Sequence, residues 1–352
     1  MSELERRQSS VWYGYEDSDA RIYQRLGLHY VHMFSQDLGE QIIPSGVDRD
    51  WGLELTVETA DPQVEKILAR GFDISRGSGY ARRLAYPLSE FTRLTTAELC
   101  DHPEAVYEIA YLYLPGRERP VGFELAHLPF YQLRRSFGRR YQVVPPDVAE
   151  HRKCLQRIRL PKENLAIFQL PQPLRRRLAR AVSTYERLSI LRPSSLYRAG
   201  ITEQTPYDFS THQRSLWLAL MEAARLTGWD ARGEYQNHVL TSYWLKQQIE
   251  FRRLGMRVRE ALMTQIYDVV RRVGEKIGFT AQVRLSGFYS DEELDEIHQL
   301  IDEGQTSFTT IADKLSMYPH RKTDSSIKDG IGEFEPQFDE GDENSVRQPV
   351  SD

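Results

Sequence analysis

Apolar residues between Thr241 and Gly278 recur in steps of three and four, which predicts one long amphipathic helix. This face carries Leu254, Val258, Leu262, Ile266, Val269, Val270, Val273 and Ile277. Gly278 is placed to end the helix, and Gly255 predicts a bend within it. At about 1.5 Å per residue the helix would extend roughly 55 Å, which suggests a structural role. A core helix of an ordinary α-rich protein is the alternative.

The same spacing predicts seven further helices. They run from about Asp19 to Ile42, Pro62 to Gly71, Ala81 to Cys100, Pro171 to Leu191, Thr211 to Thr227, Asp291 to Glu303 and Ser307 to Leu315. Pro87 predicts a break or a fresh start within the third. Ser290 and Glu293 have the spacing of a capping box before the sixth.

Alternation of apolar and polar residues predicts strands, most clearly at Val106 to Leu114 and Val121 to Leu128. Shorter candidates are Trp51 to Val57, Tyr141 to Val144, Arg157 to Leu160, Leu165 to Leu170 and Gln282 to Leu285. We therefore expect an α+β fold that is rich in helix, with one small mixed β-sheet region in the middle. A long helix lies near its C-terminal half.

The order of elements predicts four parts of the chain. A flexible arm covers residues 1–18, and an α+β domain covers 19–191 with its sheet at about 106–170. A helical domain covers 192–316 and contains the long helix at 241–278. Residues 317–352 are polar and acidic, and we expect them to be disordered.

Composition fits a globular protein without a membrane partner. Hydrophobic residues make up 40% of the 352 residues and charged residues 28%. No apolar run approaches the length of a membrane span, and the N-terminus is charged rather than signal-like. These features predict a cytoplasmic protein.

The net charge of −5 hides a basic middle and an acidic end. Residues 134–192 hold fifteen Lys and Arg against four acidic residues, a net charge of +11. Residues 317–352 hold nine acidic residues against four basic ones, a net charge of −5. The basic middle predicts an anionic partner, because a concentrated positive charge attracts polyanions such as DNA.

Eight arginines are the candidate electrostatic contacts to nucleic acid: Arg134, Arg135, Arg139, Arg140, Arg175, Arg176, Arg177 and Arg180. They could neutralise phosphates if the fold gathers them on one surface. The alternative is a solvated face that acidic residues from elsewhere in the chain balance.

Metal and cofactor sites have little support in the sequence. His29 and His32, Cys100 and His102, and His151 and Cys154 have ligand-like spacings, but the three pairs fall in different predicted elements. We therefore predict no metal and no cofactor.

Catalytic motifs are also missing. The sequence has no Gly-x-Ser-x-Gly elbow and no His-Glu-x-x-His helix, and Gly77-Ser78-Gly79 lacks the rest of a dinucleotide fingerprint. We predict that the protein is not an enzyme, although a site assembled from distant residues stays open.

From Glu104 to Leu191 the order of elements resembles the wing region of tailed-bacteriophage portal proteins. The strand EAVYEIAYLYL leads through a charged turn to VGFELAHLPF, and LPKENLAIFQLPQPLRRRLARAV then passes from strand to helix. TSYWLKQQIEFRRLGMRVREALMTQI is similar to the long helices of such proteins. The chain is shorter than most portals, and the two stem helices with their clip are not placed in it.

The resemblance implies a structural protein of a phage or prophage that forms a homo-oligomeric ring, commonly of twelve subunits. Double-stranded DNA would pass through its channel and meet basic side chains through phosphates. Terminase and capsid proteins would be further partners, and the protein would occur in the host cytoplasm or in the virion. The long helix would line or buttress the channel, residues 106–170 would form the wing, and the helices from Ser290 to Leu315 would belong to the crown.

The competing hypothesis is a cytoplasmic nucleic-acid-binding or regulatory protein. It would use the basic helix around Arg175 to Arg180 together with a helix-turn-helix-like pair at Ser290 to Leu315. The many acidic residues of that pair argue against DNA reading by it.

Overall fold

The computed structural model describes seven parts of the chain. These are residues 4–12, 29–44, 53–74, 83–190, 209–233, 240–304 and 307–316. All of them belong to one unit, Met1–Arg321. The predicted acidic tail, the first residues of the predicted helical domain (192–208) and the first part of the helix predicted from Asp19 lie outside the described residues.

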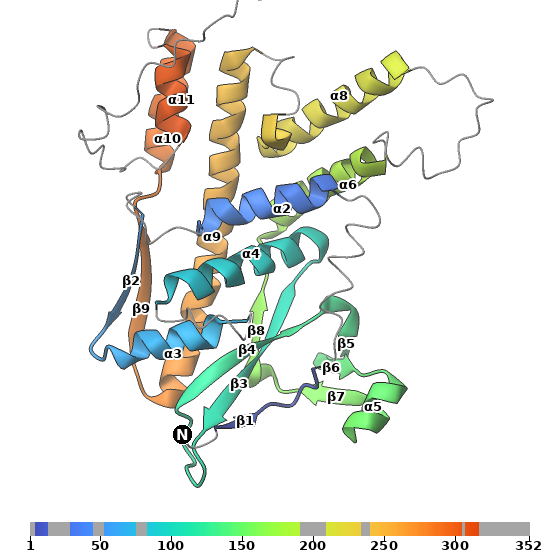
Figure 1. Ribbon diagram of the computed structural model, residues 1–352, viewed down its shortest axis with the longest axis vertical. Coiled ribbons are helices and arrows are strands. Elements are labelled where there is room, and N and C mark those ends of the chain that lie inside the picture. Colours follow the sequence, from blue (N-terminus) through green and yellow to red (C-terminus); the bar gives the residue numbers. More distant parts are fainter. Residues whose placement is uncertain are drawn as a thin grey trace, which may run out of the picture. The chain divides into compact units, whose positions relative to one another are not determined.

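Helices dominate the described residues, and the α+β prediction is confirmed (Figure 1). They are α2 (His29–Ile42), α3 (Gln63–Phe72), α4 (Ala85–Asp101), α5 (Pro146–Arg152), α6 (Gln172–Ile190), α8 (Phe209–Thr227), α9 (Thr241–Ile277), α10 (Asp291–Glu303) and α11 (Phe308–Ser316). Pro87 lies in the first turn of α4 rather than at a break, because a proline in the first turn removes no helical hydrogen bond. The sequence did not predict α5.

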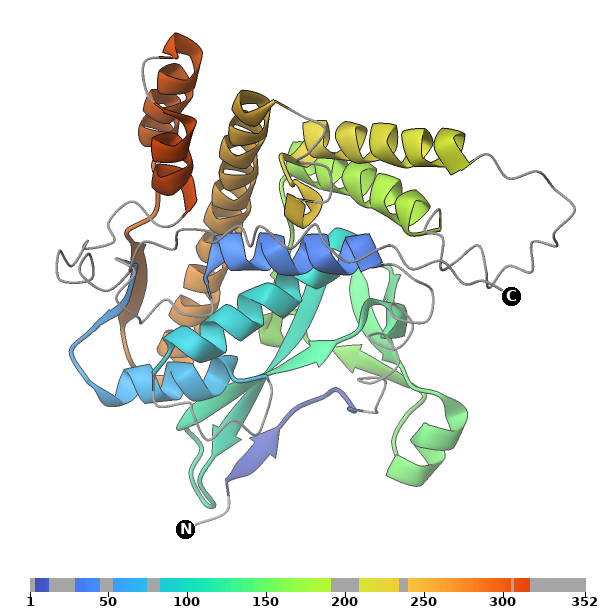
Figure 2. The same ribbon diagram turned by 45° about the horizontal axis from the view of Figure 1, so that its top comes forward.

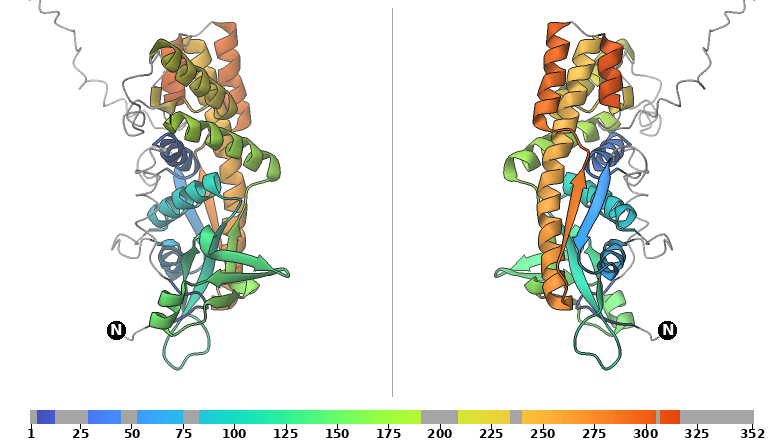
Figure 3. Two further views of the ribbon diagram at one scale, coloured as in Figure 1. Left: turned by 90° about the vertical axis from the view of Figure 1, so that its right-hand side faces the viewer. Right: turned by 90° about the vertical axis from the view of Figure 1, so that its left-hand side faces the viewer.

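The predicted long helix is confirmed as α9, which has 37 residues. Its apolar stripe from Leu254 to Val273 is buried, and Gly278 ends it in the left-handed region with φ 95°. A residue with a β-carbon is strained at that φ, so glycine is favoured there. Figure 3 shows α9 extending past α10 and α11 at one end and beside β9 (Ala281–Ser286) further along.

A four-stranded antiparallel sheet contains β1 (Glu5–Arg7), β3 (Ala105–Tyr113), β4 (Gly122–Leu128) and β8 (Leu165–Phe168). Every residue of β3 is buried, so both faces of this strand are covered. The face with Tyr107 packs against α4, where the ring centre of Phe91 lies 4.9 Å from the ring centre of Tyr107. Residues 1–18 were predicted as a flexible arm, yet β1 within them pairs with β3.

A second antiparallel sheet of three strands follows β4 in the chain. It consists of β5 (Leu133–Ser136), β6 (Arg139–Val143) and β7 (Arg157–Leu160). The sequence predicted one mixed sheet across 106–170, but this region holds two sheets whose strand pairs are all antiparallel. Leu133 and Leu160 pack against Val106 of the four-stranded sheet, and this apolar contact joins the two.

The third sheet is a ribbon of β2 (Glu54–Thr59) and β9, whose residues are far apart in the sequence. Its pairing runs from Glu54 opposite Ser286 to Thr59 opposite Ala281. Both strands were predicted, but the pairing was not. Figure 1 shows the ribbon beside α9, where Val283 joins the core.

One hydrophobic core joins α2, α4, α6, α8 and α9 to the four-stranded sheet (Figure 2). The ring of Phe34 on α2 lies 5.0 Å from Tyr185, 5.5 Å from Trp229 and 6.3 Å from Phe251. This core contains residues from both sides of the domain boundary predicted after residue 191. The division into two domains stays a prediction.

The helix pair α10 and α11 packs on α9. Ser290 and Glu293 form the predicted capping box, and Gly304 follows α10 in the left-handed region. Ile311 of α11 is buried in a cluster with Leu245 and Ile249 of α9. This end of α9 therefore has an apolar cluster of its own.

Candidate nucleic-acid interface

The three-stranded sheet has two faces of different chemistry, because side chains alternate along each strand. Arg134 lies opposite Tyr141, and Tyr141 lies opposite Arg159, so these three residues form one row across the sheet. The same face holds Ser136 opposite Arg139 and Val143 opposite Arg157. We call this surface the arginine face and define it by Arg134, Arg139, Tyr141, Arg157 and Arg159.

The opposite face of the sheet packs inward and neutralises its cations. Arg140 donates two hydrogen bonds to the carboxylate of Glu104, one of them at 2.8 Å from Nη2 to Oε2. The Nη2 atom of Arg135 lies 3.8 Å from the same carboxylate, and Gln169 also donates to it at 2.8 Å. Arg140, which is 11% exposed, is therefore held in a buried ion pair with Glu104, and the more exposed Arg135 lies at the edge of this network.

Burial of Glu104 would raise the pKa of its carboxyl, but its surroundings reverse this effect. The hydrogen bond from Arg140 and the charge of Arg140 lower the pKa, with smaller contributions from Gln169 and Arg135. The net result is a pKa below the usual value. Glu104 is thus a carboxylate at neutral pH, and it balances the positive charge on the inward face.

The arginine face has no such balance. Arg134, Arg139, Arg157 and Arg159 are all exposed, and none forms an ion pair with another described residue. Arg134 donates from Nη1 to the carbonyl oxygens of Tyr131 and Leu133 at 3.0 and 2.7 Å. The guanidinium of Arg157 lies 4.0 Å from the centre of the Tyr141 ring, within cation–π range. The face is therefore positively charged and partly aromatic.

The turn between β5 and β6 carries a fully exposed aromatic side chain. Its central residues, Phe137 and Gly138, have φ of 48° and 72°. Two successive positive φ values are typical of a type I′ hairpin turn, in which Asn-Gly is the preferred pair. Phe137 is 101% exposed, so it makes no packing contact that would offset its backbone strain.

The four predicted arginines of α6 lie in a different setting. Arg177 donates from Nε to the carbonyl of Leu226 and lies 3.7 Å from Glu250. Arg180 forms an ion pair with Glu222 at 3.5 Å. Arg175 and Arg176 form no ion pair with any residue that the structure describes. Acidic residues from elsewhere in the chain thus balance two of these four arginines, Arg177 and Arg180.

The eight predicted arginines are therefore divided between two elements. Figure 1 shows α6 beside α2 and α8, with the β5–β6–β7 sheet elsewhere on the molecule. Arg157 and Arg159, which complete the arginine face, were absent from the prediction. The alternation Arg-Ile-Arg-Leu on a predicted strand was the signal for them, because it places both arginines on one face.

The helix pair α10 and α11 offers little cationic surface. Asp291 and Asp295 of α10 form ion pairs with Arg253 of α9, and Asp302 pairs with Lys246. These contacts hold the acidic helix against α9. The geometry does not favour α11 as a helix that reads DNA, since its apolar side chains pack on α9 and no arginine lies on it.

The histidine and cysteine pairs do not assemble a metal site among the described residues. Cys100 is buried at the end of α4, and burial raises the pKa of its thiol to about 12. His102 stacks on Phe130 with ring centres 4.7 Å apart. His151 and Cys154 belong to the exposed region around α5. Each of these residues therefore has an ordinary structural setting.

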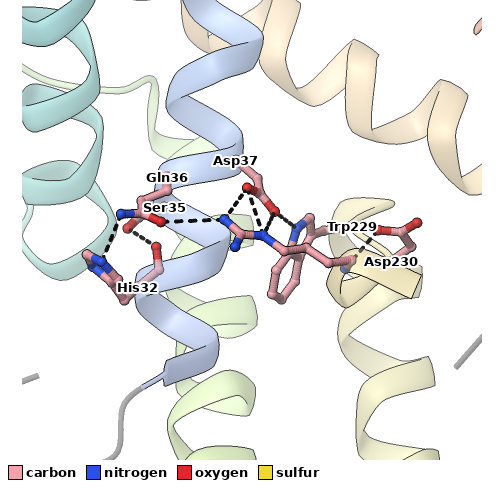
Figure 4. A network of polar contacts seen from close by, with 7 residues as sticks. His32, Ser35, Gln36, Asp37, Trp229 and Asp230 are labelled. Atoms are coloured by element: carbon pink, nitrogen blue, oxygen red, sulfur yellow. Dashed lines mark hydrogen bonds and ion pairs between the residues drawn. The ribbon is translucent and has the colours of Figure 1, made fainter. Parts of the chain in front are cut away.

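A polar network links α2 to the loop after α8 (Figure 4). Asp37 accepts hydrogen bonds from Trp229 Nε1 at 2.8 Å and from Arg232 Nε and Nη2 at 3.1 and 2.7 Å. Ala231 and Arg232 both have positive φ. Burial, followed by the charges of Arg93 and Arg232, lowers the pKa of nearby His32. The network holds a strained loop against the core and acts as a structural link.

Comparison of the sequence with models of known protein families finds no match. Comparison with curated proteins finds none either. In the part of the chain that the structure describes, no helix has the length and apolar character needed to cross a bilayer.

Proposed function

We propose that this protein is a portal-like structural subunit of a phage or prophage, which assembles into a homo-oligomeric ring around double-stranded DNA. The observation that carries the proposal is the sequence of elements from β3 to α9. The hairpin β3–β4, the passage from β8 into α6, and the 37-residue helix α9 follow one another in the order that the resemblance implies.

The structure of α9 supports a buttressing role within the proposed ring. One face of the helix is buried in the core, while Arg257, Glu260 and Arg271 are exposed on its other side. A long helix fixed along one side offers a charged surface whose position is set by the core. In a ring, such a surface would face the channel or a neighbouring subunit.

The proposal names no catalytic residue and no cofactor. Terminase and capsid proteins are the further partners that it implies, and the host cytoplasm and the virion are the implied locations. The arginines would contact DNA through phosphates, because arginines without ion pairs attract polyanions regardless of base sequence.

The decisive experiment is the particle mass in solution, measured by light scattering at two salt concentrations, with negative-stain images of the same sample. We expect closed rings of many subunits. A monodisperse monomer or dimer at high protein concentration would overturn the proposal.

The arginine face also supports a second candidate, a DNA-binding protein that acts as a monomer or dimer. This candidate predicts binding without ring formation, with an affinity that falls steeply as salt rises. Rings in the images would reject it. Duplex binding by a small species would favour it.

A further inference from the structure

The arginine face carries positive charge that no described acidic residue balances. Register places four exposed arginines on one side of three short strands, and none has an acidic partner among the described residues. On the inward side, by contrast, Glu104 neutralises Arg135 and Arg140. Mutual repulsion disfavours four unpaired cations on one small surface, and phosphate groups would remove this repulsion.

Phe137 shows where such a partner makes non-electrostatic contact. A phenylalanine at φ 48° is strained, and a fully exposed ring gains nothing from the fold. Asparagine would suit this turn better. A strained residue that does not stabilise the fold indicates a functional role, and contact with a partner is the direct explanation.

The shape of the hairpin fits a nucleic acid. Phe137 lies at the tip of the β5–β6 hairpin of the three-stranded sheet, and Arg139 and Arg134 lie on the two strands that flank this turn. The major groove of duplex DNA is wide enough for a two-stranded β-ribbon such as this hairpin, and proteins that bind the minor groove insert apolar side chains such as phenylalanine between base steps. Arginines along the ribbon would then lie near the phosphates that border the groove.

We propose that the arginine face and Phe137 form a binding site for duplex DNA. Arg134, Arg139, Arg157 and Arg159 contact phosphates, and Phe137 enters a groove and contacts bases. The choice of duplex DNA among polyanions rests on the proposed function. The anionic nature of the partner rests on the sheet alone.

The test uses the full chain and a short fluorescent DNA duplex, with binding followed by anisotropy between about 50 and 200 mM salt. In the first variant, Arg134, Arg139 and Arg159 all become alanine. The slope of a plot of log affinity against log salt concentration should then become shallower. Each arginine that no longer neutralises a phosphate should reduce this slope by about 0.9, so the triple variant should reduce it by about 2.7. Affinity at low salt should fall by more than about tenfold, because each neutralised phosphate releases counterions that favour binding.

A matched control removes the same charge from basic residues that already have acidic partners. Arg70, Lys246 and Arg284 are 54%, 38% and 57% exposed and pair with Glu124, Asp302 and Glu58. Their joint replacement by alanine should change affinity by less than about threefold and leave most of the salt dependence intact. An equal reduction in affinity in both triple variants would mean that net charge alone drives binding, and the proposal would fail.

The second variant, Phe137→Asn, tests the tip without endangering the fold, because asparagine tolerates a positive φ. We expect affinity to fall by about fivefold with an unchanged salt dependence, as for the removal of one aromatic side chain from a base. Unchanged affinity would exclude Phe137 from the site. Tighter binding to a single strand than to the duplex would overturn the assignment to duplex DNA.

The outcome is separable from that of the ring experiment. Light scattering of each variant shows whether assembly is intact, and circular dichroism shows whether the variant is folded. Wild-type protein that forms no ring, but whose DNA binding is weakened by the arginine-face substitutions, would reject the portal proposal and keep this site. Rings whose DNA affinity is insensitive to these substitutions would keep the portal proposal and reject this site.

Discussion

Gly255 of α9 lies so close to Gln41 of α2 that a β-carbon at position 255 would be 2.4 Å from the Gln41 β-carbon. The sequence suggested that this glycine bends the helix, whereas the structure gives it a packing role. Alanine favours helices by about 1 kcal/mol over glycine. The clash should outweigh this gain, so we expect Gly255→Ala to destabilise the protein by about 1–3 kcal/mol.

The measurement for Gly255→Ala is urea unfolding followed by circular dichroism. Thr264→Ala is the control, because Thr264 is exposed on the same helix and alanine is the better helix former there. The control should be neutral or slightly stabilising. Increased stability of Gly255→Ala would show that α2 moves aside without cost.

Replacing Asp37 should loosen the loop after α8. Asp37→Ala removes the acceptor of the 2.8 Å hydrogen bond from the indole N–H of Trp229 and of the 2.7 Å hydrogen bond from Arg232 Nη2. Hydrogen bonds to a charged group contribute about 1.5–3 kcal/mol, and we expect a destabilisation of this size in thermal or urea unfolding. Asp302→Ala removes only a more exposed pair with Lys246 and should leave the unfolding midpoint close to that of the wild type. Equal destabilisation by both substitutions would contradict the structural link.

Glu104→Gln should make stability less dependent on acid pH. The pKa of Glu104 is lowered in the folded state, so its carboxylate stabilises the fold above the usual pKa of 4.5. That contribution disappears as the pH falls below 4.5 and through the lowered pKa. We expect Glu104→Gln to cost about 1–3 kcal/mol at neutral pH, with a difference from wild type that narrows as the pH falls below 4.5.

Urea unfolding at several pH values measures the effect of Glu104→Gln. The control is Glu163→Gln, because Glu163 is exposed and forms no ion pair with another described residue. Its cost should stay within about 0.5 kcal/mol at every pH. A pH-independent difference for Glu104→Gln would contradict the assigned ion pairing.

Glu108 should hold the N-terminal segment on the four-stranded sheet. This fully buried carboxylate accepts backbone hydrogen bonds from Ser9 and Ser10, both at 2.8 Å, and one from the Ser10 hydroxyl. Glu108→Gln replaces one acceptor oxygen by a donor, which cannot pair with these N–H groups. We expect faster hydrogen exchange in residues 5–12, with β4 unchanged. Uniform acceleration throughout the sheet would instead indicate global destabilisation.

Phe137→Asn should stabilise the fold while weakening DNA binding. The substitution relieves the strain of a bulky residue at positive φ and should add about 0.5–1 kcal/mol. Gly138→Ala is the opposing control: a β-carbon there meets no atom within 4 Å, but φ is 72°. It should cost about 1 kcal/mol through backbone strain alone. Thermal unfolding of the two variants measures both effects.

The sequence alone determined the elements whose signals are local. Helical periodicity predicted α9, and Gly278 predicted its end, because a left-handed terminal residue favours glycine wherever the helix packs. The Ser290 and Glu293 spacing predicted the cap of α10, because a capping box also forms between residues that are close in the sequence. Alternation likewise predicted β3 and β4, since these strands have the length and composition of a sheet interior.

Tertiary structure decided which of these elements meet. The pairing of β2 with β9, the docking of β1 on β3, and the close approach of Gly255 to Gln41 join residues that are far apart in the chain. Local patterns contain no information about such partners. A strand of three residues, such as β1, also shows too little alternation to be recognised without the partner that orders it.

The candidate site divides in the same way. The sequence identified a basic middle region, because charge is a property of composition. Only strand register placed Arg134 and Arg139 on the outward face with Arg159, and only the fold brought Glu104 to Arg140. A cation attracts an external polyanion when no internal acid neutralises it, and that balance is set by distances that only tertiary structure defines.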